Sequence, residues 1–252
     1  MQWLAVVVAP FVGSFLGVLV RRLPRGEPVG WTRSACETCA RPLGAGDLLP
    51  IVSFLAHRGR CRTCRAPIGG FHLAIELAAV GVALGAVALT PEPQRVWTGC
   101  VLGWWLLALG WIDAVHMLLP DVLTLPLILA GLGVAWLDDP AAVAGHALGA
   151  AAGYLAFRAV GACYARLRGR DGLGEGDAKL LAAAGAWLGW QPLADLVLVA
   201  ALSALAVGLG IALYRRRLQG DLALPFGPFL AIALWLIWVW QNWGLSPSGG
   251  TG

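Results

Sequence analysis

The chain has 252 residues, of which 59% are hydrophobic and only 13% are charged, and its formal net charge is +4. A soluble globular domain has about 25% charged residues and about half apolar residues. The composition therefore excludes an ordinary soluble domain and predicts an all-α polytopic membrane protein.

Eight apolar segments are candidates for membrane-spanning helices, because a span needs about 20 apolar residues. They cover residues 3–20, 71–89, 96–112, 119–137, 141–163, 178–190, 193–214 and 223–243. The first has no basic start, and Arg21 and Arg22 follow it where a signal peptide would have a cleavage site. We interpret it as a retained span. The sixth is short and would reach only about 20 Å into a core of about 30 Å.

The basic residues lie in alternate loops. Half of the 18 Lys and Arg residues fall within residues 21–65, and smaller groups fall in the loop at 166–170 and at 215–217. The positive-inside rule places such loops in the cytosol, so two spans must separate the last two groups. This predicts about eight transmembrane helices, a large cytosolic loop at 21–70 and a disordered tail at 246–252. Segregated charge favours membrane topology over nucleic-acid binding, and we expect no nucleic-acid partner.

The large loop contains two CxxC pairs, Cys36 with Cys39 and Cys61 with Cys64. Two such pairs at this separation are typical of a tetrathiolate zinc site. Zinc would fold a knuckle-like loop that is too small and polar to build its own core. A redox pair is the alternative, although a cytosolic loop disfavours stable disulfides and no βαβ pattern accompanies the motif. A degenerate or empty site also stays open.

Two aspartates lie at the predicted cytosolic ends of spans. Asp113 follows an apolar run, and Asp177 closes the sequence Gly174-Glu-Gly-Asp. A carboxylate at membrane depth is costly, and two of them beside glycine or proline suggest a pair that shares one proton and activates water, as in aspartic proteases. Asp121 is the alternative to Asp113, but its position favours a role as the N-cap of the next span.

Together these features resemble the type IV prepilin leader peptidases, bacterial enzymes of type IV pilus and type II secretion systems. The resemblance covers most of the chain. It rests on segment 13–24, the double CxxC loop, Asp113 with the Leu-Leu-Pro-Asp and Leu-Thr-Leu-Pro sequences at 118–126, segment 172–180, and Pro-Phe-Gly-Pro-Phe-Leu at 225–230. Segment 172–180 contains the GxGD signature that is shared with archaeal preflagellin peptidases and presenilins.

The resemblance implies that Asp113 and Asp177 are the catalytic aspartates of a membrane-embedded endopeptidase. Such enzymes remove the basic leader of prepilins and pseudopilins at the cytosolic face of the bacterial inner membrane. Many members then methylate the new N-terminus with S-adenosylmethionine, and the double CxxC loop accompanies these bifunctional members. Two departures fall in the methylation-associated part, Gly17 in place of a frequent Asn and the sequence at residues 69–73.

The expected organisation is a methyltransferase part at residues 1–70 and a peptidase core at 71–245. No Gly-rich loop follows a strand, so the residues that bind the methyl donor are not identified. Glu76, early in the second span, is either a buried hydrogen-bonding partner or a participant in methyl transfer.

Three alternatives stay open. The first is a peptidase without methyltransferase activity. The second is a proton-coupled transporter that uses the aspartates as proton carriers, although carriers place such acids near the middle of the membrane. The third is a membrane thiol oxidoreductase, which would need its CxxC pairs near an oxidising compartment.

Overall fold

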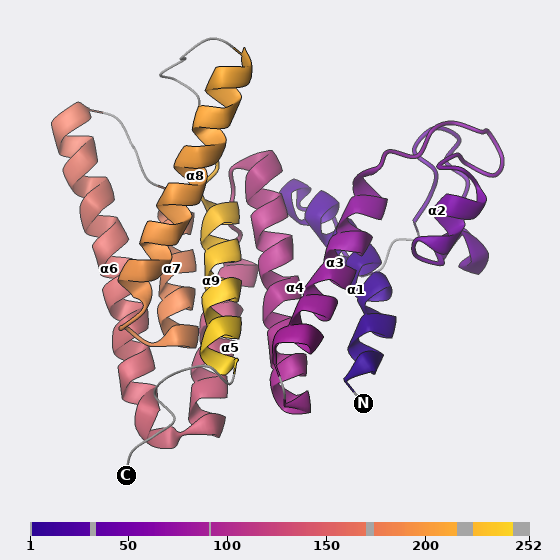
Figure 1. Cartoon of the computed structure of the whole chain (residues 1–252). Helices are drawn as coiled ribbons and strands as arrows, with labels where there is room; N and C mark the ends of the chain where they lie inside the picture. Colours follow the sequence, from indigo (N-terminus) through magenta and orange to yellow (C-terminus); the bar gives the residue numbers. More distant parts are fainter. Residues whose placement is uncertain (1, 31–33, 91, 170–173, 216–223, 244–252) are drawn as a thin grey trace. The chain divides into compact units, whose positions relative to one another are not determined.

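The computed structural model describes residues 2–30, 34–90, 92–169, 174–215 and 224–243 (Figure 1). Over these residues the ordered elements are helical, apart from two isolated β-bridges. The helices are α1 (Trp3–Arg22), α2 (Val52–Ala56), α3 (Phe71–Leu89), α4 (Pro93–His116), α5 (Asp121–Asp138), α6 (Val143–Arg168), α7 (Glu175–Leu188), α8 (Leu193–Arg215) and α9 (Gly227–Asn242). Short 3-10 turns cover Leu23–Arg25, Ala45–Leu48 and Pro140–Ala142. The predicted tail at 246–252 lies outside the described residues.

The predicted all-α membrane architecture is confirmed. Each of the eight apolar segments forms a helix, and the additional short helix α2 lies in the large loop. Within the described residues, six helices are long and apolar enough to cross a membrane: α1, α3, α4, α5, α6 and α8. The other two are shorter, with 14 residues in α7 and 16 in α9. The sixth segment is thus short in the structure, as the sequence predicts.

The chain forms two compact units, and the division falls within α4 between Ala108 and Leu109. In the first unit α1 packs against α3, and glycine makes this possible. A Cβ on Gly13 would lie 2.6 Å from the Cα of Glu76, which is closer than side chains tolerate. The indole N–H of Trp104 donates to the carbonyl of Ala79 at 2.9 Å and ties α4 to α3.

In the second unit α7 is enclosed by α5 and α6, and Figure 1 shows it alongside α6. Ten of its 14 residues are buried. A helix that is apolar all round is stable only when neighbours cover it. A Cβ on Gly185 would lie 2.2 Å from the carbonyl group of Gly149, and the indole N–H of Trp187 donates to the carbonyl of Leu127 at 2.9 Å. These contacts fix the short helix within the protein.

Candidate functional site

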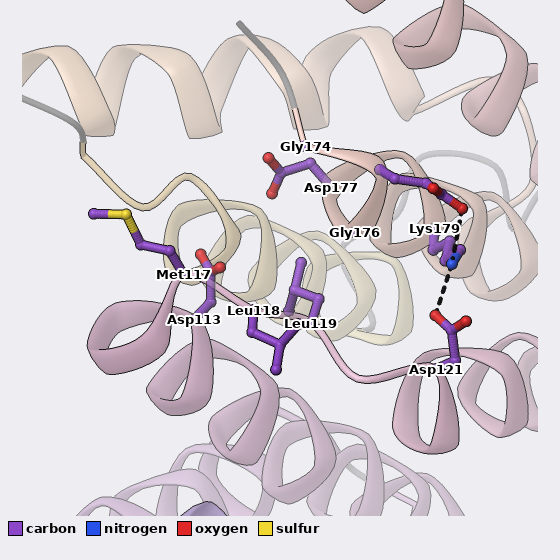
Figure 2. Close-up of a pocket in the computed structure, with 10 residues that line it drawn as sticks. Asp113, Met117, Leu118, Leu119, Asp121, Gly174, Gly176, Asp177 and Lys179 are labelled. Atoms are coloured by element: carbon purple, nitrogen blue, oxygen red, sulfur yellow. Dashed lines mark hydrogen bonds and ion pairs between the residues drawn. The ribbon is translucent and has the colours of Figure 1, made fainter. Parts of the chain in front are cut away.

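A pocket of about 360 Å³ opens in the second unit where α4 ends and where α5 and α7 begin (Figure 2). It is lined by Asp113, Met117, Leu118, Leu119, Asp121, Gly174, Glu175, Gly176, Asp177 and Lys179. Both aspartates that the sequence singles out lie in this one pocket, Asp113 on α4 and Asp177 on α7. The pocket has four acidic residues, Asp113, Asp121, Glu175 and Asp177, beside an apolar wall.

Asp113 lies in the last turn of α4 and is only 6% exposed. The backbone N–H of Gly227, the first residue of α9, donates to its Oδ2 at 2.9 Å. The carbonyl of Asp113 accepts the N–H of Met117 at 2.8 Å, and Met117 has a left-handed φ of 51°. A residue in that conformation costs about 1–2 kcal/mol, so a strained residue directly follows α4 and lines the pocket.

Asp177 lies in the first turn of α7, three residues after the N-cap Gly174. Between them, Gly176 lies directly against the chain that follows α4. A Cβ on Gly176 would be 2.7 Å from the Cβ of Leu119, a buried residue. Glycine at this position therefore allows α7 to begin close to the end of α4. The geometry gives a physical reason for the second glycine of the GxGD sequence.

Asp113 and Asp177 line the same pocket, so their charges repel each other when both are ionised. Figure 2 shows their carboxyl groups on different sides of the same opening, with Asp113 on the end of α4 and Asp177 on the start of α7. Two like charges in a partly buried site are costly, so such a pair favours a state with one shared proton. A carboxylate that accepts a proton and a carboxyl that donates one can then face the same substrate.

Asp121 lines the same pocket but has a different environment. The Nζ of Lys179 donates to its Oδ1 at 2.7 Å and also contacts Glu175 at 3.0 Å. The expectation that Asp121 caps the fourth predicted span is wrong. The N-cap is Pro120, and Asp121 is the first residue of α5. Its side chain pairs with Lys179 because the start of α7 lies beside the start of α5.

The hydrogen bond from Gly227 to Asp113 does not follow from the sequence. The two residues are 114 positions apart, and only the packing of α9 against α4 brings them together. The signal in the sequence is local: a glycine between two prolines at a helix start, in Pro225-Phe-Gly-Pro. That pattern predicts a constrained turn and does not reveal its partner.

The first unit contains the four cysteines of the large loop as one cluster. The sulfur atoms of Cys36, Cys39, Cys61 and Cys64 all lie within 4.8 Å of one another. The Sγ atoms of Cys36 and Cys64 are 3.8 Å apart, which is too long for a disulfide, where the distance is about 2.05 Å. Four thiolates at about 2.3 Å around a tetrahedral zinc ion would lie about 3.8 Å from one another. The cluster fits a tetrathiolate metal site.

The two CxxC turns share one backbone design. The N–H of Cys36 donates to the carbonyl five residues later at 2.9 Å, and Cys61 makes the equivalent bond at 2.8 Å. The residues after the second cysteines, Ala40 and Arg65, have left-handed φ values of 55° and 57°. Backbone N–H groups of Cys39 and its neighbour lower the pKa of Cys36 to about 6, and the equivalent groups lower the pKa of Cys61. Each turn thus favours a thiolate, the form that binds a metal, at its first cysteine, whereas burial and the neighbouring sulfur atoms raise the pKa of Cys64 to about 11.

Glu76 is buried in α3, with 6% of its surface exposed. Its Oε2 accepts the backbone N–H of Ile51 at 2.7 Å. Ile51 belongs to the large loop and has a left-handed φ of 60°. Glu76 is therefore a buried hydrogen-bonding partner that ties the loop to α3, and its participation in methyl transfer stays a prediction.

Comparison with known proteins gives two family models and a set of similar curated proteins. The model described as type IV leader peptidase family matches residues 100–209, and the model described as bacterial peptidase A24 N-terminal domain matches residues 7–90. The first match contains Asp113 and Asp177, and the second contains the cysteine cluster and Glu76. No solved structure matches the chain significantly.

Three of the similar proteins illustrate the range of identity. One from Burkholderia pseudomallei (strain 1026b) is 42% identical, with 90% of this chain and 81% of the relative aligned. One from Aeromonas hydrophila is 38% identical, covering 92% and 88%. One from Pseudomonas aeruginosa is 34% identical, covering 94% and 89%. All three relatives are named prepilin leader peptidase/N-methyltransferase.

Proposed function

The chain belongs to the type IV leader peptidase family, and we propose that it is a membrane-embedded aspartic endopeptidase that removes the leader of prepilin-like proteins and then methylates the new N-terminus. The names of the relatives support both activities. The observation that carries the peptidase proposal is the shared pocket of Asp113 and Asp177.

The chemistry of the pair is that of two carboxyl groups with one proton. The ionised carboxylate takes a proton from water, and the water oxygen bonds to the carbonyl carbon of the scissile peptide. The protonated carboxyl donates to the carbonyl oxygen as charge develops there. Collapse of the tetrahedral intermediate breaks the C–N bond, and the amine leaves with the proton that the first carboxylate received. Asp113 and Asp177 have these two roles.

Two observations favour Asp113 over Asp121 as the partner of Asp177. Asp113 is 6% exposed and is held by a neutral backbone donor, whereas the Asp121 side chain is 57% exposed and is paired with the Lys179 cation. A catalytic carboxyl needs a low-dielectric site and an available proton acceptor. An acid that is already paired with a cation at the rim meets neither need.

The position of the acids argues against a transporter. Asp113 lies in the last turn of α4 and Asp177 in the first turn of α7. Carriers place their acids near the middle of the bilayer. The helix-end position instead suits a substrate that reaches the membrane surface. A peptidase that lacks methyl transfer stays as the alternative within the family.

Cys36, Cys39, Cys61 and Cys64 would hold one zinc ion, which would stabilise the fold of the loop and take no part in peptide hydrolysis. S-adenosylmethionine would supply the methyl group for the new amine, and we assign no residue of this chain to its binding. Residues 1–70 would form the methyltransferase part and residues 71–245 the peptidase core. The pocket would face the cytosol from the bacterial inner membrane, as the basic loops suggest.

The test is mass spectrometry of a prepilin-type substrate incubated with the purified protein and S-adenosylmethionine. Wild type should remove the leader and add one methyl mass, whereas Asp113→Asn and Asp177→Asn should leave the substrate intact. Asp195→Asn is the matched control, because Asp195 lies in the first turn of α8 and outside the pocket. Normal cleavage by either pocket variant would refute the assignment. Cleavage without methylation would leave a peptidase alone.

A further inference from the structure

Gly227 contributes two properties to the environment of Asp113. The first is its backbone N–H, which donates to Oδ2 at 2.9 Å in a buried position. The second is the absence of a side chain. A Cβ at this position would lie 2.6 Å from Oδ2, 2.9 Å from Cγ and 3.1 Å from Cβ of Asp113. The aspartate side chain is short and almost fully buried, so it cannot avoid such a clash without turning its carboxylate.

The start of α9 leaves one donor for this bond. The first N–H groups of a helix have no partner within the helix. Here the N–H groups of Phe229 and Leu230 both donate to the carbonyl of Phe226, at 3.1 Å and 3.2 Å. Pro228 has no N–H to give. Among the amides at this helix start, the sequence thus directs that of Gly227 to the aspartate, and the positive end of the helix dipole reinforces the bond.

We propose that Gly227 is a positioning residue for peptide hydrolysis, because its N–H and its missing side chain hold the Asp113 carboxylate in the orientation that faces the pocket. The proposal rests on the proposed function of the aspartate pair. A hydrogen bond from a backbone N–H to a carboxylate stabilises the ionised form.

The first experiment measures leader cleavage by Gly227→Ala. A misplacement of about 1 Å costs about 100-fold in rate, so kcat should fall by about that factor while KM stays within a factor of two. Gly110→Ala is the matched control, since Gly110 lies on α4 against the same helix start and its Cβ would meet Pro228 at a tolerable 3.4 Å. Wild-type kcat in Gly227→Ala, or a loss that appears only in KM, would overturn the proposal.

The second experiment does not require Gly227→Ala to fold. Hydrogen exchange is followed by mass spectrometry in a peptide that covers residues 224–229, where two prolines leave few amides. Asp113→Ala should release one additional exchanging amide relative to wild type. Asp113→Asn keeps an oxygen acceptor and should retain most of the protection. Equal exchange in wild type and Asp113→Ala would overturn the proposed contact.

The outcomes separate this proposal from the proposed function. If wild type does not cleave prepilin-type substrates, or if Asp113→Asn cleaves normally, the peptidase assignment fails and takes the positioning role with it. If the aspartate variants are inactive while Gly227→Ala retains wild-type turnover, the peptidase assignment stands and only the role of Gly227 is lost.

Discussion

Gly176→Ala should separate the two aspartates by moving the start of α7. The added Cβ would lie 2.7 Å from Cβ and 3.2 Å from Cδ1 of Leu119. Ordinary contact between carbon atoms is about 3.5–4.0 Å, so the two segments must move apart by about 1 Å. Asp177 is the next residue and moves with the turn. Overpacking of this kind costs about 1–3 kcal/mol in stability, and a displacement of 1 Å at the reacting groups costs about 100-fold in kcat.

The assay compares kcat for leader cleavage with the midpoint of thermal unfolding. Gly133→Ala in α5 is the matched control, because its Cβ would meet nothing within 4 Å. It should behave as wild type. Leu119→Gly in the Gly176→Ala background removes the Cβ and Cδ1 atoms that clash, so part of the lost kcat should return. Wild-type turnover in Gly176→Ala, or a double variant no better than Gly176→Ala, would refute the steric argument.

Three further predictions concern the rest of the structure. Cys61→Ser should release bound zinc, measured by elemental analysis, and should expose the large loop to protease; a full zinc content in the variant would contradict the tetrathiolate site. Glu76→Ala should lower stability by about 1–3 kcal/mol because the Ile51 N–H loses its acceptor. Glu76→Gln should keep most of the stability. Equal unfolding midpoints for the two variants would argue against the contact. Lys179→Met should change stability by less than about 1 kcal/mol, since ion pairs that are partly exposed, such as that with Asp121, contribute little. A tenfold loss of kcat would show that the pair has a catalytic role.

The sequence predicts the helices of this protein well, because the signal for a membrane helix is a run of apolar residues within one segment. It also identifies α7 as too short to cross a bilayer on its own. The sequence does not show, however, what stabilises so short a helix. Burial by α5 and α6 depends on contacts such as that between Gly149 and Gly185, which a list of small residues does not pair.

Each candidate site also has features that the sequence predicts and features that only the fold shows. The spacing of the cysteines predicts the cluster, because each CxxC pair forms a turn from adjacent residues. Only the contact between the two turns depends on the fold of the loop. The left-handed residues after those turns are alanine and arginine, so no glycine marks them in the sequence. For the aspartates, predicted topology puts both acids on one side of the membrane. Asp121 is misassigned because N-capping is inferred from residue type, whereas the chain enters α5 through Pro120.

The pocket is assembled by backbone contacts of glycine more than by its charged rim. Gly176 sets the approach of α7 to the end of α4, and Gly227 holds Asp113 from α9. An added methyl group at either glycine would meet the Cβ of a buried side chain, Leu119 or Asp113, and a Cβ cannot move without its backbone, so the displacement reaches the carboxylates. The ion pair of Lys179 is partly exposed and can rearrange at little cost. Turnover should therefore fall more in Gly176→Ala or Gly227→Ala than in Lys179→Met, although only Lys179→Met removes a charge from the pocket. The reverse order would mean that electrostatics of the rim, rather than the separation of the two aspartates, limits hydrolysis.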